Sequence, residues 1–177
     1  TMTQISNIHK KGNYLLIGNS RLHWAVKRNE TWEFTHTSKK EINIEFLKMP
    51  LSAWAAVGAI PKNMSLDPSL EITLKDIPLL ELPPWLGIDR ALGSWAAYKK
   101  AKASLNLHSN GILIADAGTV LSLTKISAKG EFEGGQLSAG LHLQLKAMSE
   151  DTKNLSYTSI DSIPNSLFPR STKDKSL

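Results

Sequence analysis

The sequence contains no cysteine among its 177 residues, which excludes a disulfide framework and any chemistry that needs a thiolate nucleophile. We therefore expect a cytoplasmic protein. No apolar run approaches the roughly 20 residues that a membrane-spanning helix needs, so we expect no membrane partner. The five histidines lack the spacing of a metal-binding motif.

The composition is that of a globular protein. Hydrophobic residues make up 41% of the chain, which is enough for one sizeable domain or two small ones around real cores. The net charge of +5 comes from scattered lysines and arginines, without a basic stripe interleaved with aromatic residues. This pattern indicates a surface that tolerates anionic substrates, and we expect no nucleic-acid partner.

The first half of the chain has the pattern of several short strands and two helices. A turn at Gly18-Asn19-Ser20 separates the first two apolar or alternating runs, and a proline-rich stretch from Ile77 to Trp85 predicts an extended connection because proline interrupts helices. The expected strands are 14–17, 21–26, 32–35, 53–59 and 70–74. The expected helices are 41–49, which Pro50 ends, and 91–105, with its apolar face at Leu92, Trp95 and Ala96.

A second set of elements follows from residue 112. We expect strands at 112–116 and 120–127, a further short strand at 131–133, and a helix at 141–149. The first strand ends on Asp116, and the turn Ala117-Gly118-Thr119 supplies free amides and a hydroxyl. Because exposed amides attract anionic oxygens, such a hairpin tip suits a polyphosphate and its cation.

The second set repeats the layout of residues 14–49. Superposing Gly18 on Gly118 sets Leu16 against Asp116 and Asn19 against Thr119. Such a duplication predicts two similar lobes, 1–110 and 111–177, that face each other across a ligand-binding cleft. A complete second lobe would need more residues, so we expect this one to lack its C-terminal part.

Three segments in order resemble the signatures of type III pantothenate kinase, of the actin, acetate kinase and sugar kinase superfamily. They are Gly18-Asn19-Ser20-Arg21, Gly87-Ile88-Asp89-Arg90, and Asp116-Ala117-Gly118-Thr119 with the trailing Gly134-Gly135 and Gly140. The resemblance implies an α/β fold of two ribonuclease-H-like lobes, actin-like and duplicated. It also implies a homodimeric transferase that uses ATP, Mg²⁺ and a monovalent cation, K⁺ or NH₄⁺, to phosphorylate pantothenate in the first step of coenzyme A biosynthesis.

The resemblance also implies a role for individual residues. Asp89 would be the catalytic base that accepts the proton of the pantothenate hydroxyl. Asp116 would bind the monovalent cation. The residues expected to bind pantothenate are Gly87, Ile88, Asp89, Arg90 and Thr172. Those expected to bind ATP are Ile17, Gly18, Asn19, Ser20, Arg21 and Thr119.

Two positions depart from the family pattern, and several alternatives stay open. The family usually has an aspartate at position 16 and a lysine at position 23, where this chain has Leu16 and His23. Leucine cannot hold magnesium, and an isolated histidine on an alternating strand is usually a surface or packing residue. Asp89 could instead be a helix N-cap, and Asp116 could cap a turn. Gly134-Gly135 could be a bulge. The alternative functions are a catalytically impaired or regulatory homologue and another small-molecule kinase of the superfamily.

Overall fold

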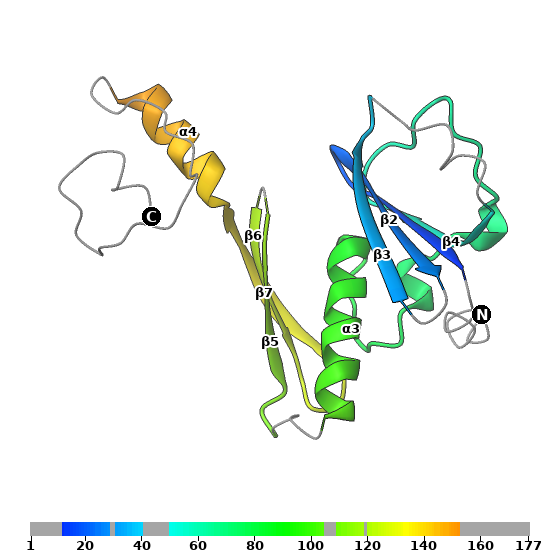
Figure 1. The fold of residues 1–177 in the computed structure, drawn as a ribbon. Helices are drawn as coiled ribbons and strands as arrows, with labels where there is room; N and C mark the ends of the chain where they lie inside the picture. Colours follow the sequence, from blue (N-terminus) through cyan, green and yellow to red (C-terminus); the bar gives the residue numbers. More distant parts are fainter. Residues whose placement is uncertain (1–11, 29–30, 41–49, 105–108, 119, 153–177) are drawn as a thin grey trace. The chain divides into compact units, whose positions relative to one another are not determined.

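A computed structural model describes residues 12–28, 31–40, 50–104, 109–118 and 120–152 (Figure 1). Three expectations lie outside these residues, namely the helix at 41–49 and the ligand-binding roles of Thr119 and Thr172. No helix in the described part of the chain is long and apolar enough to cross a membrane. The chain divides into two compact units, Thr1–Asn106 and Leu107–Leu177.

The first unit contains a four-stranded mixed sheet in the order β3-β2-β1-β4. Its strands are β1 (Asn13–Ile17), β2 (Arg21–Arg28), β3 (Thr31–Ser38) and β4 (Leu51–Ala56). Strands β1, β2 and β3 pair antiparallel in sequence order, and β4 pairs parallel with β1. These strands confirm the four predicted from alternating or short apolar runs in this region.

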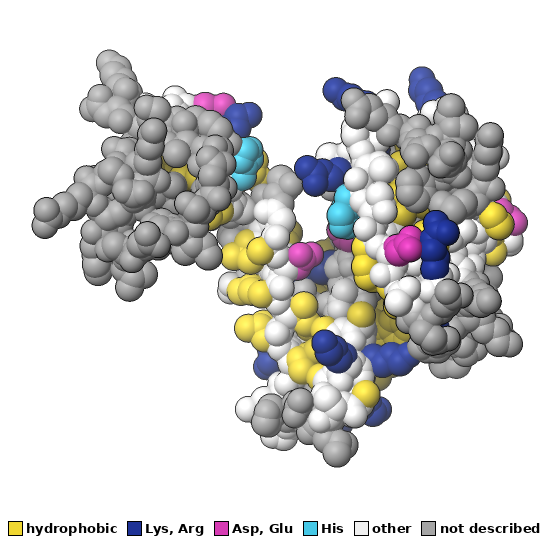
Figure 2. All heavy atoms as spheres, viewed as in Figure 1, with side chains coloured by type: hydrophobic (Ala, Val, Ile, Leu, Met, Phe, Trp, Pro, Cys, Tyr) yellow, Lys and Arg dark blue, Asp and Glu magenta, His cyan; other side chains and the backbone are white. Residues whose placement is uncertain are grey.

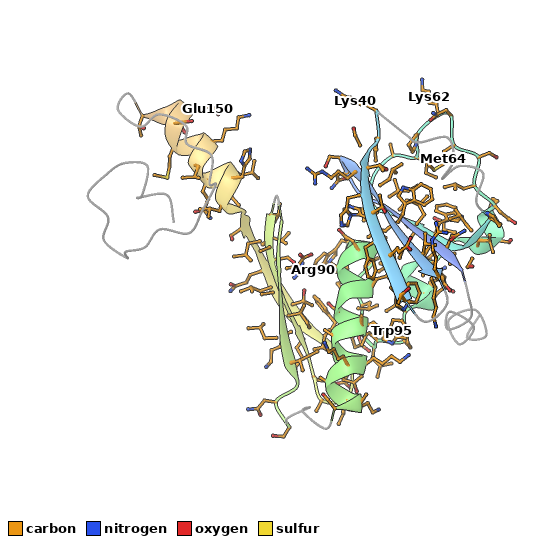
Figure 3. The ribbon with its side chains drawn as sticks, in the orientation of Figure 1. Lys40, Lys62, Met64, Arg90, Trp95 and Glu150 are labelled. Atoms are coloured by element: carbon orange, nitrogen blue, oxygen red, sulfur yellow. The ribbon has the colours of Figure 1, made fainter. Side chains whose placement is uncertain are left out.

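The core of this unit lies on one face of the sheet. Alternate residues of β1 and β2 point to that face because side chains alternate along a strand, and Ile17 and Leu22 are fully buried there. The other members of the cluster are Leu15, Trp24, Trp54 and Met64, of which Figure 3 labels Met64. The indole Nε1 of Trp54 donates a hydrogen bond of 2.8 Å to the carbonyl oxygen of Asp67, which satisfies the polar atom of this buried side chain.

Helix α3 (Ile88–Ala103) packs against β4. Ala53 and Ala55 are buried on the face opposite to Trp54, and Ala91 is fully buried on the helix. The helix begins three residues earlier than predicted because Gly87 is its N-cap. Its buried stripe is also different from the predicted one, since Ile88, Ala91, Ser94 and Tyr98 are buried while Leu92 and Trp95 are half-buried and Ala96 is exposed.

The expected strand at 70–74 is wrong. Two 3₁₀ helices, η1 (Pro68–Leu70) and η2 (Leu74–Asp76), occupy this region instead, and Glu71 makes only an isolated parallel bridge with Trp54. The Asp67 carboxylate accepts hydrogen bonds from the N–H and the hydroxyl of Ser69, so local caps outcompete strand pairing. No helix forms between Ile77 and Gly87, as the prolines predict.

The second unit contains a three-stranded antiparallel sheet in the order β5-β6-β7, followed by a helix. Its elements are β5 (Ile112–Ala117), β6 (Val120–Ile126), β7 (Phe132–Ala139) and α4 (Leu141–Asp151). The predicted order of strands and helix is confirmed, but β7 runs through Gly134-Gly135 and is longer than expected. The register passes from Lys125–Gly134 to Ile126–Phe132, so Glu133 is the extra residue of a β-bulge directly before Gly134.

This second sheet exposes large apolar side chains. Leu113 and Leu137 are 67% and 65% exposed, and Figure 2 shows hydrophobic side chains gathered on the visible face of these strands. Helix α4 has no buried residue. The architecture is therefore mixed α/β with two sheets, and each sheet contains an antiparallel three-stranded meander, β1-β2-β3 or β5-β6-β7.

Candidate functional site

The turn between β1 and β2 is held from two sides. The N–H of Gly18 donates to the carbonyl oxygen of Arg21 at 2.9 Å, and the N–H groups of Val57 and Gly58 donate to the carbonyl oxygen of Ile17 at 2.8 and 3.3 Å. The side chain of Ile17 is fully buried. Its backbone therefore fixes the segment after β4 against the turn, while Asn19 and Ser20 remain exposed at the tip.

Gly58 is required by this contact. A Cβ atom on Gly58 would lie 2.5 Å from the carbonyl oxygen of Gly18 and 2.9 Å from Cα of Asn19, closer than real Cβ atoms approach other atoms. It would also lie 2.8 Å from Nζ of Lys39, which donates a hydrogen bond of 2.9 Å to the carbonyl oxygen of Ala59. The contact thus places a lysine ammonium beside the turn.

A histidine pair lies next to the same turn. His23 on β2 stands opposite Leu16 on β1 and opposite His36 on β3. The two Nδ1 atoms of the histidines are 2.8 Å apart, which is a hydrogen bond whose donor depends on the tautomer. The rings meet edge to face, with centroids 4.8 Å apart and planes at 70°.

The pairing of these two histidines across β2 and β3 was not predicted from the sequence. Because Arg28 pairs with Thr31, only residues 29 and 30 link β2 to β3. A two-residue connection fixes the register of a hairpin, and counting back from it sets His23 opposite His36. Lys39 and Gly58 were also missed, and their sequence context carries no signal that would identify them.

The electrostatic environment of His23 links the first motif to the second. Burial lowers the pKa of His23 below its ordinary value of 6.5, and the positive charges of His36 and Arg21 lower this pKa further, whereas Asp89 acts in the opposite direction. The carboxylate of Asp89 is therefore close enough to His23 to act on its charge. The Asp89 charge thus acts on a histidine that precedes it by more than sixty residues in the sequence.

Asp89 and Arg90 lie in the first turn of α3 (Figure 3). Asp89 is not the N-cap, because Gly87 occupies that position. The Oδ1 atom of Asp89 accepts the N–H of Arg90 at 2.7 Å, one of the first-turn amides without an intrahelical partner. Asp89 is exposed, so its second carboxylate oxygen can face a ligand.

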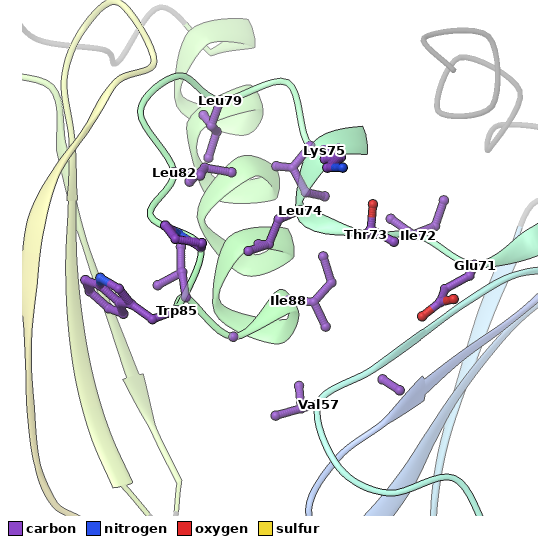
Figure 4. A pocket seen from close by; sticks show the side chains of 15 residues that line it. Val57, Glu71, Ile72, Thr73, Leu74, Lys75, Leu79, Leu82, Trp85 and Ile88 are labelled. Atoms are coloured by element: carbon purple, nitrogen blue, oxygen red, sulfur yellow. The ribbon is translucent and has the colours of Figure 1, made fainter.

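A groove of about 930 Å³ adjoins this helix N-terminus (Figure 4). Gly87 and Ile88 line its end next to Asp89. The walls come from the end of β4, from η2 and the segment before it, and from the extended segment that precedes α3. They are mainly apolar, with polar groups from Glu71, Thr73 and Lys75. A concave, mainly apolar surface with a few polar groups suits a small organic molecule.

Asp116 lies in the second unit, at the exposed end of β5. It stands opposite Ser122 of β6. The N–H of Gly118 donates to the carbonyl oxygen of Val120 at 3.1 Å, and no described residue hydrogen-bonds to the Asp116 carboxylate, so the turn-cap interpretation has no support in this part of the chain. The carboxylate and the Ser122 hydroxyl are oxygen donors of the kind that hard cations prefer.

The arrangement in the first unit suits an anionic ligand and a hydroxyl-bearing one. Lys39, His23 and the β1–β2 turn can bind anionic oxygens, the groove can bind an organic substrate, and Asp89, next in sequence to the groove residue Ile88, can accept a proton. No group of three or more histidines and carboxylates among the described residues could hold a metal ion by itself.

Comparison with known proteins shows the family of the chain. The family model described as type III pantothenate kinase matches residues 76–175, more than half of the chain, although part of that range lies outside the described residues. The chain is 34% identical over 159 residues to the type III pantothenate kinase of Thermosynechococcus vestitus, covering 85% of this chain and 58% of that protein.

Two other relatives have the same name. The chain is 31% identical to the type III pantothenate kinase of Nostoc sp., covering 88% of this chain and 65% of that protein, and 31% identical to that of Synechocystis sp., covering 77% and 52%. The chain thus spans roughly half to two thirds of the length of these relatives. With Gly87 and Ile88 of the Gly87-Ile88-Asp89-Arg90 motif lining a groove, and with this similarity, the chain belongs to the type III pantothenate kinase family.

Proposed function

We propose that this protein transfers the γ-phosphoryl group of ATP to the primary hydroxyl of pantothenate, giving 4'-phosphopantothenate and ADP in the first step of coenzyme A biosynthesis. The observation that supports it best is the Gly87-Ile88-Asp89-Arg90 motif beside the groove that Gly87 and Ile88 line, and the effect of the Asp89 charge on the pKa of His23 beside the β1–β2 turn is consistent with it. A phosphate held at the turn and a hydroxyl held beside Asp89 would be neighbours.

The proposed reaction needs alignment more than covalent help from the protein. The hydroxyl oxygen of pantothenate forms a bond to the γ-phosphorus while the bond from that phosphorus to the β-γ bridging oxygen breaks. Asp89 accepts the hydroxyl proton. The groove beside Gly87 and Ile88 would hold the rest of pantothenate, and Arg90 has the planar fork that binds a carboxylate.

The nucleotide would lie at the β1–β2 turn. Gly18, Asn19, Ser20 and Arg21 would contact the phosphates, with Lys39 beside them. An ATP contact by Thr119 remains a prediction from the family resemblance. Mg²⁺ neutralises charge on the β- and γ-phosphates when it is bound. Because Leu16 offers no oxygen ligand and the described residues contain no metal-binding cluster, we propose that the ion enters with the phosphates of ATP.

We further propose that Asp116 and Ser122 bind the monovalent cation, K⁺ or NH₄⁺. The exposed carboxylate at the end of β5 and the hydroxyl opposite it supply the oxygen donors that support this role. The two antiparallel meanders support the proposal that the units are duplicated ribonuclease-H-like lobes. A homodimer, a pantothenate-binding role for Thr172 and a cytoplasmic location remain predictions from the family resemblance.

A coupled assay of ADP release tests the kinase proposal. Pantothenate, ATP and magnesium are supplied with KCl and, in parallel, with NaCl at the same ionic strength. We expect turnover that depends on pantothenate and on K⁺, and its loss in Asp89→Asn. The absence of turnover from a folded protein that binds ATP would favour the second candidate, a catalytically impaired homologue, which the substitution of the usual acid by Leu16 supports.

A further inference from the structure

The histidine pair beside the β1–β2 turn has no role in the proposal above. We propose that His23 and His36 act as one proton-accepting unit that binds the anionic oxygens of the nucleotide, with His36 as a positioning residue that holds the ring of His23 against the turn. This inference rests on the proposed function in that the anion is taken to be the phosphate chain of ATP.

The geometry directs one nitrogen of the pair at the turn. The Nδ1 atoms of His23 and His36 face each other at 2.8 Å, so the Nε2 atom of each ring points away from the shared bond. For His23, Nε2 lies 3.1 Å from the position that a Cβ on Gly18 would occupy. It makes no hydrogen bond to any residue that the structure describes, so it remains available to a ligand at the turn.

A hydrogen bond between two Nδ1 atoms limits the pair to a single extra proton. A neutral pair has one proton in the bond and one Nε2–H, on the ring that accepts. One further proton gives a cation in which both Nε2 atoms carry hydrogen, and the bond between the rings is kept. A second proton would leave two N–H donors facing each other, which the distance of 2.8 Å forbids.

The groups around His23 on balance disfavour its protonation. Arg21 on the same strand and His36 on β3 disfavour its protonation, as burial does, and Asp89 on α3 favours it. Lys39, with its ammonium beside Gly58, adds a fixed positive charge near the turn. A polyphosphate bound there would offset these positive charges and raise the pKa of the pair, so binding would be accompanied by proton uptake.

Proton-linked binding has a clear signature. Each unit by which the bound anion raises the pKa of the pair makes binding about tenfold tighter at a pH below both pKa values than at a pH above them. The ionisation of ATP itself also contributes, and a variant with a fixed positive charge in place of the pair isolates that contribution. His23→Lys is such a variant.

The test is calorimetric titration of the intact chain with MgATP, without pantothenate, at pH 6, 7 and 8. Each titration uses two buffers of different ionisation enthalpy, so that the number of protons taken up is measured. Near pH 7, we expect the unmodified protein to take up about half a proton or more per bound MgATP in excess of the uptake by His23→Lys. We also expect it to bind MgATP about three- to tenfold more tightly at pH 6 than at pH 8, after subtraction of the pH dependence of the affinity measured for His23→Lys.

Two further variants separate positioning from charge. His36→Phe removes the shared bond, and we expect it to lose most of the extra proton uptake while His142→Gln, which removes a histidine from α4, keeps it. Equal proton uptake by the unmodified protein and His23→Gln, or no binding of MgATP, would overturn the inference. Proton-linked binding without pantothenate turnover would leave it standing and reject only the kinase proposal.

Discussion

Gly58 lies directly against Gly18, so the segment after β4 and the β1–β2 turn share one backbone contact. The N–H of Gly58 donates to the carbonyl oxygen of Ile17 at 3.3 Å, and only hydrogen fits in place of a side chain at position 58. The shape of the turn therefore depends on a residue forty positions further along the chain, outside the motif that resembles a nucleotide-binding signature.

Gly58→Ala should damage nucleotide binding. The added methyl group must displace the backbone of Gly18 and Asn19, and overpacking of this kind costs about 1–3 kcal/mol. We expect a lower free energy of unfolding and a higher KM for ATP, with a smaller effect on the KM for pantothenate. Gly93→Ala is the matched control, because a Cβ there meets no atom within 4 Å.

In the exposed helical position of Gly93, alanine should stabilise the protein by about 0.5–1 kcal/mol. Chemical denaturation measures both variants. Equal effects of the two substitutions would contradict the contact between Gly58 and the turn.

Asp89→Asn should separate catalysis from folding. The amide oxygen of asparagine can still accept the N–H of Arg90, so we expect little change in the thermal midpoint. Loss of a general base typically lowers kcat about 100- to 10,000-fold. If Asp89→Asn instead unfolds, the role of the carboxylate is to stabilise the N-terminus of α3.

Acidification without ligand should destabilise the protein through His23. Its folded-state pKa is below the ordinary value of 6.5, so the unfolded chain binds the proton more readily and stability rises with pH. The favourable contribution is complete above 6.5 and is lost as the pH falls toward the lower folded-state pKa.

We therefore expect the thermal midpoint of the unliganded protein to decrease as the pH is lowered from 7.5 to 5.5. The fall should be smaller in His23→Gln and unchanged in His142→Gln. Identical pH profiles for all three proteins would show that His23 titrates normally.

Trp54→Phe should lower stability by about 1–3 kcal/mol, since the buried indole of Trp54 is lost together with its hydrogen bond to the carbonyl oxygen of Asp67. Trp32→Phe is the control, because Trp32 is 40% exposed and stacks with Phe34 at 6.4 Å. Urea denaturation compares the two. A loss in Trp32→Phe as large as that in Trp54→Phe would argue against the assigned core.

Asp116→Asn should abolish the activation by K⁺ while leaving the thermal midpoint nearly unchanged, because the carboxylate is exposed at the end of β5. The ADP-release assay with KCl and with NaCl measures this. Persisting K⁺ activation in the variant would place the cation elsewhere.

The sequence predicted the strands well where a local rule decides the structure. Alternation in Arg21 to Val26 and the apolar run ending at Ile17 follow directly from burial of one face of a sheet. The two 3₁₀ helices were not predicted, because the alternating pattern at 70–74 indicated a strand. Capping by Asp67 and Thr73 competes with strand formation there. That capping chemistry is itself readable from Asp-Pro-Ser and from Thr-x-x-Asp.

The candidate site was predictable only in part. Asp89 and the β1–β2 turn carry recognisable motifs, but the contribution of Lys39 and Gly58 depends on how distant segments pack. The hydrophobic periodicity of the sequence does not indicate such packing. The histidine pair was predictable in principle, because the two-residue connection between β2 and β3 fixes the register that sets His23 opposite His36.

The parallel pairing of β1 with β4 has a consequence for the order of folding. Strands β5, β6 and β7 pair only with sequence neighbours, and the β1–β2 and β2–β3 pairings also join sequence neighbours, so these contacts are fast to form. By contrast, Asn13 meets Leu51 only after a long loop has closed, and loop closure costs entropy before any contact repays it. During synthesis, β1 can pair with β2 first but with β4 only after β4 has left the ribosome, so the β1–β2 turn acquires its final shape only then.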